Sequence, residues 1–199
     1  IYDCATKEDL GLYVFSASHE GTSNFPLGIA ALADGTKAYV AAERDDAVYV
    51  LDTRDPAKPT LLKSLPTGAH PVAVLLSKDQ RKLFVSNSLS DTISVVDTSS
   101  DRIIGTVLLR PRMARDVPGV TPLGLAISPD QKTLYAALGD MNAVAVIDLK
   151  DMELRGYIPT GWYPSAVAAT SDGRLLVANA KGFNVRTPNN APDPRSPQH

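Results

Sequence analysis

The residues of this chain that could do chemistry are few and widely spaced. The histidines are His19, His70 and His199, and no His-x-x-x-His or Glu-x-x-His spacing occurs. Because a metal site needs several convergent His, Cys, Asp or Glu ligands, the sequence predicts no metal site. Cys4 is the single cysteine, which excludes an internal disulfide and every cysteine-based zinc pattern.

Motifs for nucleophilic catalysis or cofactor attachment are absent as well. The chain contains neither Gly-x-Ser-x-Gly nor Cys-x-x-Cys-His, so we predict no catalytic residue and no cofactor. Asp52, Asp97 and Asp148 could together form a carboxylate cluster. Each of them closes a Val/Ile-rich run at the same place in a repeat, however, and we interpret them as turn caps.

The best candidate chemistry lies in the residue pairs that precede four prolines. These pairs are Asn24-Phe25, Ala69-His70, Val120-Thr121 and Trp162-Tyr163. They differ from one another while the flanking sequence repeats, which is typical of a binding surface on a repeated scaffold. Aromatic rings and an imidazole could stack on a planar ligand or a sugar and exchange hydrogen bonds with it.

We therefore predict a ligand-binding surface, called the rim, at the mouth of a central channel. Its residues are Asn24, Phe25, His70, Thr121, Trp162 and Tyr163. The alternative is that these side chains only pack between adjacent repeat units.

A second candidate site is an arginine-rich insertion at residues 110–119. It makes the second interval between repeat-starting prolines 51 residues long, against 45 before it and 42 after it. Arg110, Arg112 and Arg115 could bind a phosphate, a carboxylate or a loop of a partner. The alternative is a solvated loop whose arginines only keep it in water.

A repeat along the chain must position these residues. Copies begin at Pro26, Pro71, Pro122 and Pro164. Each copy has a Pro-led apolar run, an Asp-containing turn and a second apolar run, and the first three close on a Val/Ile-rich run ending in Asp. Short, often alternating apolar runs bounded by turn residues predict strands. Such units cannot bury an apolar face alone, so they must stack.

The repeat predicts an all-β fold, a β-propeller with four-stranded blades. The fourth, outer strands are expected near Thr60–Leu65, Ile103–Leu108 and Leu154–Ile158. We expect residues 1–199 to form one propeller region. It divides into a half blade at 1–25, whole blades at 26–70, 71–121 and 122–163, a half blade at 164–180, and a Pro/Asn-rich tail at 181–199.

The half blades at the two ends have two interpretations. In the first, the chain is a segment, with three whole and two half blades, of a larger ring of about seven blades. In the second, the two halves pair with each other and close a four-bladed ring. We favour the first, because small rings demand strongly wedge-shaped blades and the small inner-strand residues suit a broader ring equally well.

The repeats resemble those of a known family. The Ser-Pro-Asp turn at 128–130, the strands at 134–137 and 176–179, and the Val95–Thr98 close are similar to the YVTN-type β-propeller repeat, over nearly the whole chain. The stretch 159–182 resembles the propeller part of bacterial proteins that join a propeller to an alkaline-phosphatase-superfamily phosphoesterase domain. The resemblance implies a longer parent protein in the periplasm or outside the cell. That catalytic domain is not among these residues, so its activity is not carried over.

Composition excludes little. With 21% charged residues and a formal net charge of -2, the chain has no strong electrostatic attraction to nucleic acid or acidic membranes. No run of 18 apolar residues occurs, so no membrane span is expected.

Three functions fit these observations. The first, which we prefer, is a non-catalytic scaffold for ligand or protein binding in a secreted or periplasmic protein. The second is an accessory propeller of a phosphoesterase whose catalytic domain lies elsewhere, and the third is a lactonase-like propeller enzyme. The expected partner is another protein domain or subunit, bound through the channel-mouth face or open blade edges. A small ligand is a further possibility, and no nucleic acid is expected.

Overall fold

The fold is built from antiparallel strands joined by short turns. A computed structural model describes residues 1–11, 13–14, 24–111 and 119–182. Three sheets have four strands each, paired in chain order. The first holds β3 (Pro26–Ala31), β4 (Lys37–Ala42), β5 (Ala47–Asp52) and β6 (Thr60–Pro66), with a 3-10 helix at Glu43–Asp45. The second holds β7 (Pro71–Leu76), β8 (Lys82–Asn87), β9 (Thr92–Asp97) and β10 (Arg102–Leu108). The third holds β11 (Pro122–Ile127), β12 (Thr133–Leu138), β13 (Ala143–Asp148) and β14 (Glu153–Pro159).

Two further sheets have two strands each. They are β1 (Tyr2–Asp3) with β2 (Glu8–Asp9), and β15 (Trp162–Ala169) with β16 (Leu175–Gly182). The β15–β16 hairpin is longer than the expected half blade at 164–180. Among the described residues, no strand of one two-stranded sheet pairs with a strand of the other, so the closed four-bladed alternative is not the arrangement observed.

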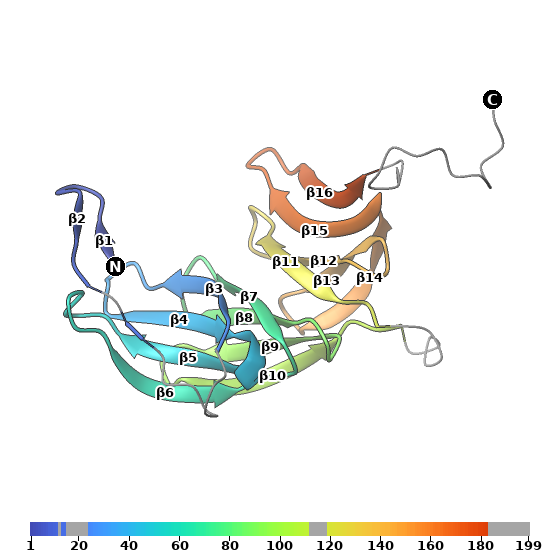
Figure 1. Ribbon diagram of the computed structural model, residues 1–199. Coiled ribbons are helices and arrows are strands. Elements are labelled where there is room, and N and C mark those ends of the chain that lie inside the picture. The colour runs from blue at the N-terminus through green and yellow to red at the C-terminus, as the bar shows by residue number, and fades with distance from the viewer. Residues whose placement is uncertain (12, 15–23, 112–118, 183–199) are drawn as a thin grey trace, which may run out of the picture.

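The four-stranded sheets confirm the prediction of an all-β propeller with four-stranded blades. Figure 1 shows the sheets side by side along an arc. The first strands of successive sheets, β3, β7, β11 and β15, contact one another. Gly124 of β11 permits the closest of these approaches, because a Cβ atom there would lie 2.8 Å from the Cα of Ala166.

The apolar core lies between neighbouring sheets. Phe84 and Ile93 of the second sheet form one cluster with Leu134 and Ile147 of the third, and all four side chains are fully buried. A second cluster joins the first sheet to the second in the same way, through residues such as Tyr39. Each sheet therefore needs a neighbour to bury its apolar face, as the repeat predicts.

In the second and third sheets, a glutamine in the turn between the first two strands accepts a backbone N–H from the preceding sheet. Gln80 Oε1 accepts the Ala33 N–H at 3.0 Å, and Gln131 Oε1 accepts the Lys78 N–H at 3.2 Å. At the corresponding place between the third sheet and β15–β16, Pro129 has no N–H and Gly173 has no side-chain acceptor. This glutamine–backbone hydrogen bond therefore joins the sheets at the first two junctions and cannot form at the third.

The strand-ending aspartates cap their own turns. Asp52 Oδ1 accepts the Arg54 N–H at 3.0 Å, and Asp148 Oδ1 accepts the Lys150 N–H at 2.8 Å. Asp97 Oδ1 accepts the Ser100 N–H at 2.8 Å. The three carboxylates serve three separate turns, which confirms their interpretation as caps.

Within the described parts of the chain, no helix is long and apolar enough to cross a membrane.

Candidate functional site: the rim at one end of the sheets

The rim residues occupy a strained backbone position. Four of them directly precede a strand-starting or strand-embedded proline and have a positive φ: Phe25 (49°), His70 (53°), Thr121 (51°) and Tyr163 (56°). This left-handed conformation is uncommon for residues other than glycine, and it is least favourable for a β-branched residue such as Thr121. Strain of this kind persists only where neighbouring groups fix the backbone.

Side-chain oxygens from the turns between second and third strands fix three of these residues. The N–H groups of His70, Thr121 and Tyr163 donate to Asp46 Oδ1 at 2.8 Å, Asp91 Oδ1 at 3.2 Å and Asn142 Oδ1 at 2.9 Å. Sequence reasoning missed Asp46, Asp91 and Asn142. The signal was present, because an Asp or Asn stands directly before β5, β9 and β13 alike.

Asn24 and Phe25 are held by their surroundings. Asn24 is buried, with 5% of its surface exposed, and its amide donates to Asp45 and to the Tyr49 hydroxyl. Burial, together with the hydrogen bond to Asp45, raises the pKa of Tyr49 to about 12. The Arg44 guanidinium lies 4.4 Å from the centre of the Phe25 ring. Asn24 thus fits the packing alternative better than the ligand-binding one.

His70 and Thr121 each meet a carboxylate. His70 Nδ1 lies 3.3 Å from Glu43 Oε1, and both side chains are partly exposed. The Thr121 hydroxyl donates to the Asp140 carboxylate. These contacts place an acid beside His70 and beside Thr121, and the imidazole of His70 stays 40% exposed.

The arginine-rich insertion is described only at its ends. Arg110 Nε lies 2.9 Å from Asp91 Oδ2, so the one described arginine of the three is already paired with a carboxylate. Asp91 is buried, with 6% of its surface exposed. Arg112 and Arg115 lie outside the described residues, and the anion-binding prediction for them stays a prediction.

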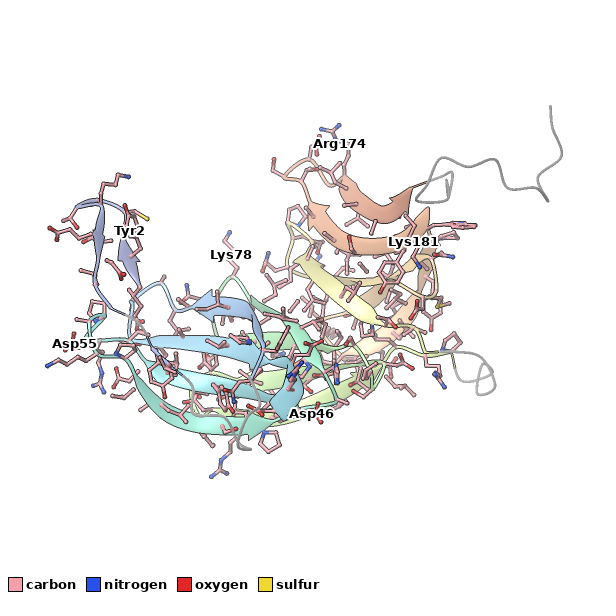
Figure 2. The ribbon with its side chains drawn as sticks, in the orientation of Figure 1. Tyr2, Asp46, Asp55, Lys78, Arg174 and Lys181 are labelled. Atoms are coloured by element: carbon pink, nitrogen blue, oxygen red, sulfur yellow. The ribbon has the colours of Figure 1, made fainter. Side chains whose placement is uncertain are left out.

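A small pocket lies where the third sheet meets β15. Its volume is about 210 Å³. It is lined by Gly139, Asp140, Asn142, Trp162, Tyr163 and Lys181. Trp162 is 51% exposed. Lys181, labelled in Figure 2, lies at the end of β16. Its Nζ is 4.4 Å from the centre of the Tyr163 ring.

The rim pocket therefore combines an exposed indole with groups of both charges. Asp140 and Lys181 are exposed at its edge, and Asn142 contributes an amide. Trp162 and Tyr163, which the sequence analysis expected on the rim, both line this pocket. Asn24, Phe25 and His70 lie instead at the rim ends of the first two sheets. Among the residues that the structure describes, no group of three His, Cys, Asp or Glu side chains could hold a metal ion.

Comparison with known proteins gives distant relatives. No family model matches the chain. The uncharacterized protein YncE of Salmonella typhi is 23% identical over 171 residues, which cover 84% of this chain and 45% of YncE. The Salmonella typhimurium YncE gives the same values. The chain thus spans less than half the length of the curated relatives it matches.

Solved structures share the fold. Kuenenia stuttgartiensis hydrazine synthase matches with a TM-score of 0.68 and 26% identity, over 84% of this chain and 45% of that one. A 6-phosphogluconolactonase candidate from Bacteroides uniformis ATCC 8492 matches with a TM-score of 0.64 and 20% identity, over 77% of this chain and 47% of that one. At 20% identity the second match shows the fold alone. Together these similarities support a β-propeller relationship.

Proposed function

We propose that this chain is a non-catalytic β-propeller scaffold that binds a ligand or a protein at the rim. The observation that carries the proposal is the rim pocket, in which the half-exposed Trp162 stands beside Asp140 and Lys181. Large aromatic side chains exposed beside polar groups are typical of binding surfaces. The equivalent positions before the other three repeat prolines hold Asn24, Ala69 and Val120, so the exposed indole is particular to this junction.

The chemistry of the rim pocket favours a ligand with one apolar face and polar edges, such as a sugar ring. The indole offers a flat apolar surface, while Asp140 and Asn142 offer hydrogen-bond acceptors and Lys181 a donor.

Trp162 is the only tryptophan of the chain, so its fluorescence reports on this pocket alone. We expect titration with glucose, maltose or chitobiose to change the emission of Trp162 saturably. Trp162→Ala should weaken binding of the same sugar about fivefold to a hundredfold in calorimetry, by analogy with a base stacked on an aromatic ring, which contributes on the order of 1–3 kcal/mol. Tyr2→Ala removes an exposed aromatic ring away from the rim and is the matched control. Unchanged binding by Trp162→Ala would contradict the sugar assignment.

A lactonase-like enzyme is the second candidate, because one structural neighbour is named for that activity. The scaffold proposal expects no hydrolysis of 6-phosphogluconolactone above the spontaneous rate. The assay is proton release in weak buffer with the chain present and absent. Hydrolysis that Trp162→Ala or His70→Ala abolishes would replace the scaffold proposal with the enzyme.

The identity of a protein partner and the cellular location follow from the family resemblance alone. We propose a periplasmic or extracellular location and, as the finer alternative, an accessory role beside a phosphoesterase domain outside these residues. Sequencing the gene beyond the codon for His199 tests the accessory role, because a metal-binding phosphatase sequence must then follow.

A further inference from the structure

At the junction between the first and second sheets, side chains of the first sheet bind the carboxylate of Asp101 from the second. Lys37 Nζ, from the start of β4, lies 2.9 Å from Asp101 Oδ2, which belongs to the turn between β9 and β10. The hydroxyl of Tyr39 donates to Asp101 Oδ1 at 2.7 Å. Tyr39 is fully buried, and burial together with Asp101 raises its pKa. An ammonium and a phenol thus hold one carboxylate between two sheets.

The next junction repeats this arrangement without the carboxylate. The strand register shows which residues are equivalent. Lys82 of β8 is equivalent to Lys37 of β4, because each pairs with the aspartate that ends the next strand. Phe84 is equivalent to Tyr39, because each lies two residues further along its strand and pairs with a valine. In the β13–β14 turn, Met152 stands directly before Glu153 as Asp101 stands before Arg102. Phe84 therefore replaces the phenol and Met152 replaces the acid, while the lysine is kept.

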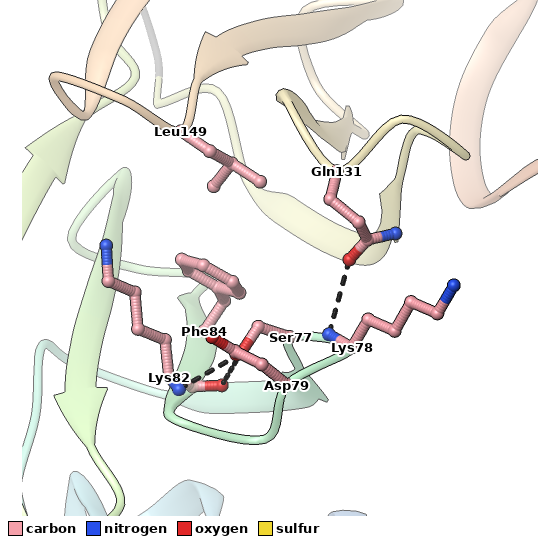
Figure 3. Close-up of a pocket in the computed structure, with 7 residues that line it drawn as sticks. All are labelled: Ser77, Lys78, Asp79, Lys82, Phe84, Gln131 and Leu149. Atoms are coloured by element: carbon pink, nitrogen blue, oxygen red, sulfur yellow. Dashed lines mark hydrogen bonds between the residues drawn. The ribbon is translucent and has the colours of Figure 1, made fainter.

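A cavity of about 390 Å³ lies at this second junction. It is lined by Ser77, Lys78, Asp79, Lys82, Phe84, Gln131 and Leu149. Figure 3 shows the Phe84 ring with Lys82 on one side, Leu149 above it, and Gln131 and Lys78 on the other side. The volume falls within the range of about 300–1,000 Å³ that small-molecule sites occupy.

The charges of the lining favour an anion. Asp79 is its acidic residue, and its Oδ1 already accepts the Ser77 hydroxyl at 2.6 Å and the Arg81 N–H at 3.1 Å. Those hydrogen bonds, that of Ser77 first, lower the pKa of Asp79. In the described parts of the chain, no carboxylate lies within 4.0 Å of Lys82 Nζ, whereas Lys37 has Asp101.

We infer that this junction cavity binds a small carboxylic acid with an aromatic or apolar body. The carboxylate of the ligand pairs with Lys82, as Asp101 pairs with Lys37 in the first junction. The body of the ligand lies against Leu149 and the apolar stem of Lys82, next to the fully buried Phe84. The cavity opens at the β7–β8 and β13–β14 turns, at the opposite end of the sheets from the rim, so the inference is independent of the proposed function.

The test uses fluorine NMR on the full 199-residue chain with 4-fluorobenzoate, 4-fluorophenylacetate and 6-fluoro-2-naphthoate as probes. We expect at least one acid to bind more tightly than its neutral amide. Lys82→Met keeps the apolar stem, removes the charge and should weaken binding of the acid about tenfold, with little effect on the amide. Lys150→Met removes an exposed lysine of the neighbouring turn that does not line the cavity, and it should leave binding unchanged.

A second variant supplies an acid from the chain itself, at position 152 in the turn that contributes Leu149 to the cavity. Met152→Asp restores the acid found at position 101, and the positive φ of Met152 (59°) suits aspartate. We expect a folded protein, by circular dichroism, that no longer binds the acids. Equal binding of acid and amide, unchanged binding by Lys82→Met, or no binding of any acid would overturn the inference. Should Met152→Asp fail to fold, Lys82→Met alone decides.

Discussion

The carboxylate of Asp91 holds more groups of the rim than the equivalent carboxylate of Asp46. Its carboxylate accepts the N–H groups of Val120 at 2.7 Å and Thr121 at 3.2 Å, and it pairs with Arg110. Asp46, at the equivalent place in the first sheet, accepts the single N–H of His70 and is exposed. Thr121 is thus fixed by the buried Asp91, which has three partners, whereas His70 is fixed by the exposed Asp46, whose carboxylate accepts one N–H.

This difference predicts unequal costs of mutation. Asp91→Ala should lower the free energy of unfolding by about 2–4 kcal/mol, because it leaves Arg110 and two N–H groups without their acceptor. Asp46→Ala, the matched control, should cost about 1 kcal/mol or less. Urea unfolding followed by circular dichroism gives both values. Equal losses in the two variants would show that the carboxylate of Asp91 is not what fixes Thr121.

The sequence predicted which residues lie on the rim, but it did not predict what their side chains contact. Variation before the repeated prolines indicated Thr121, Trp162 and Tyr163, and the last two line one pocket. The hydrogen-bond partners were not predicted, because they join segments that lie far apart in the sequence. Asn24 illustrates this: its side chain is buried against Asp45, in a turn 21 residues further along the chain.

At the scale of elements, the packing of first strand on first strand depends on small residues. A Cβ atom at Gly124 would lie 2.8 Å from Ala166 Cα and 2.9 Å from the Ser165 carbonyl oxygen. Both obstacles are backbone of β15, which cannot rotate away as a side chain can. Gly156 of β14 is also a strand glycine, but a Cβ atom there would meet nothing within 4 Å.

We therefore expect opposite results from two glycine-to-alanine substitutions. Gly124→Ala should lower stability by about 1–3 kcal/mol, since overpacking forces the strands apart. Gly156→Ala should be neutral or slightly stabilising, because alanine restricts the unfolded chain more than glycine does. Thermal unfolding of the two variants is the measurement. A Gly124→Ala protein as stable as Gly156→Ala would mean that β11 and β15 are further apart than the structure shows.

The strands themselves were largely predictable, because alternating apolar runs and turn residues mark them directly. The outer strands expected at 60–65, 103–108 and 154–158 are observed at 60–66, 102–108 and 153–159. The largest difference is at β15, which begins at Trp162, before Pro164. A proline usually opens a strand, but here it sits at a register shift, where its missing N–H is tolerated.

Across the molecule, the turns share one feature, an aspartate whose ionised carboxylate accepts hydrogen bonds from the turn itself. An aspartate in each of eight turns has a pKa below its ordinary value of 3.8, with a hydrogen bond to its carboxylate as the largest cause. They are Asp3, Asp34, Asp52, Asp79, Asp97, Asp130, Asp148 and Asp172. For Asp52 and Asp97 the pKa falls to about 2.

Acid should therefore destabilise the molecule at all of its sheets together. A carboxylate whose pKa is lowered by folding stabilises the folded state above its unfolded pKa, and this contribution is lost as the pH falls through the folded pKa. We expect the melting temperature to fall steadily between about pH 4 and pH 2. Asp97→Asn should melt lower than the unmodified chain at pH 6 and converge with it near pH 2. A melting temperature that is flat over this range would contradict the prediction.

Each four-stranded sheet pairs its strands in strict chain order, and this order bears on how the protein is made. A sheet whose partners are all consecutive can assemble as soon as its last strand leaves the ribosome, because no contact waits for a distant part of the chain. Its apolar face is then covered when the next sheet follows. Synthesis from the N-terminus would add one finished sheet after another, and each new sheet would cover the apolar face that the previous sheet turns toward it.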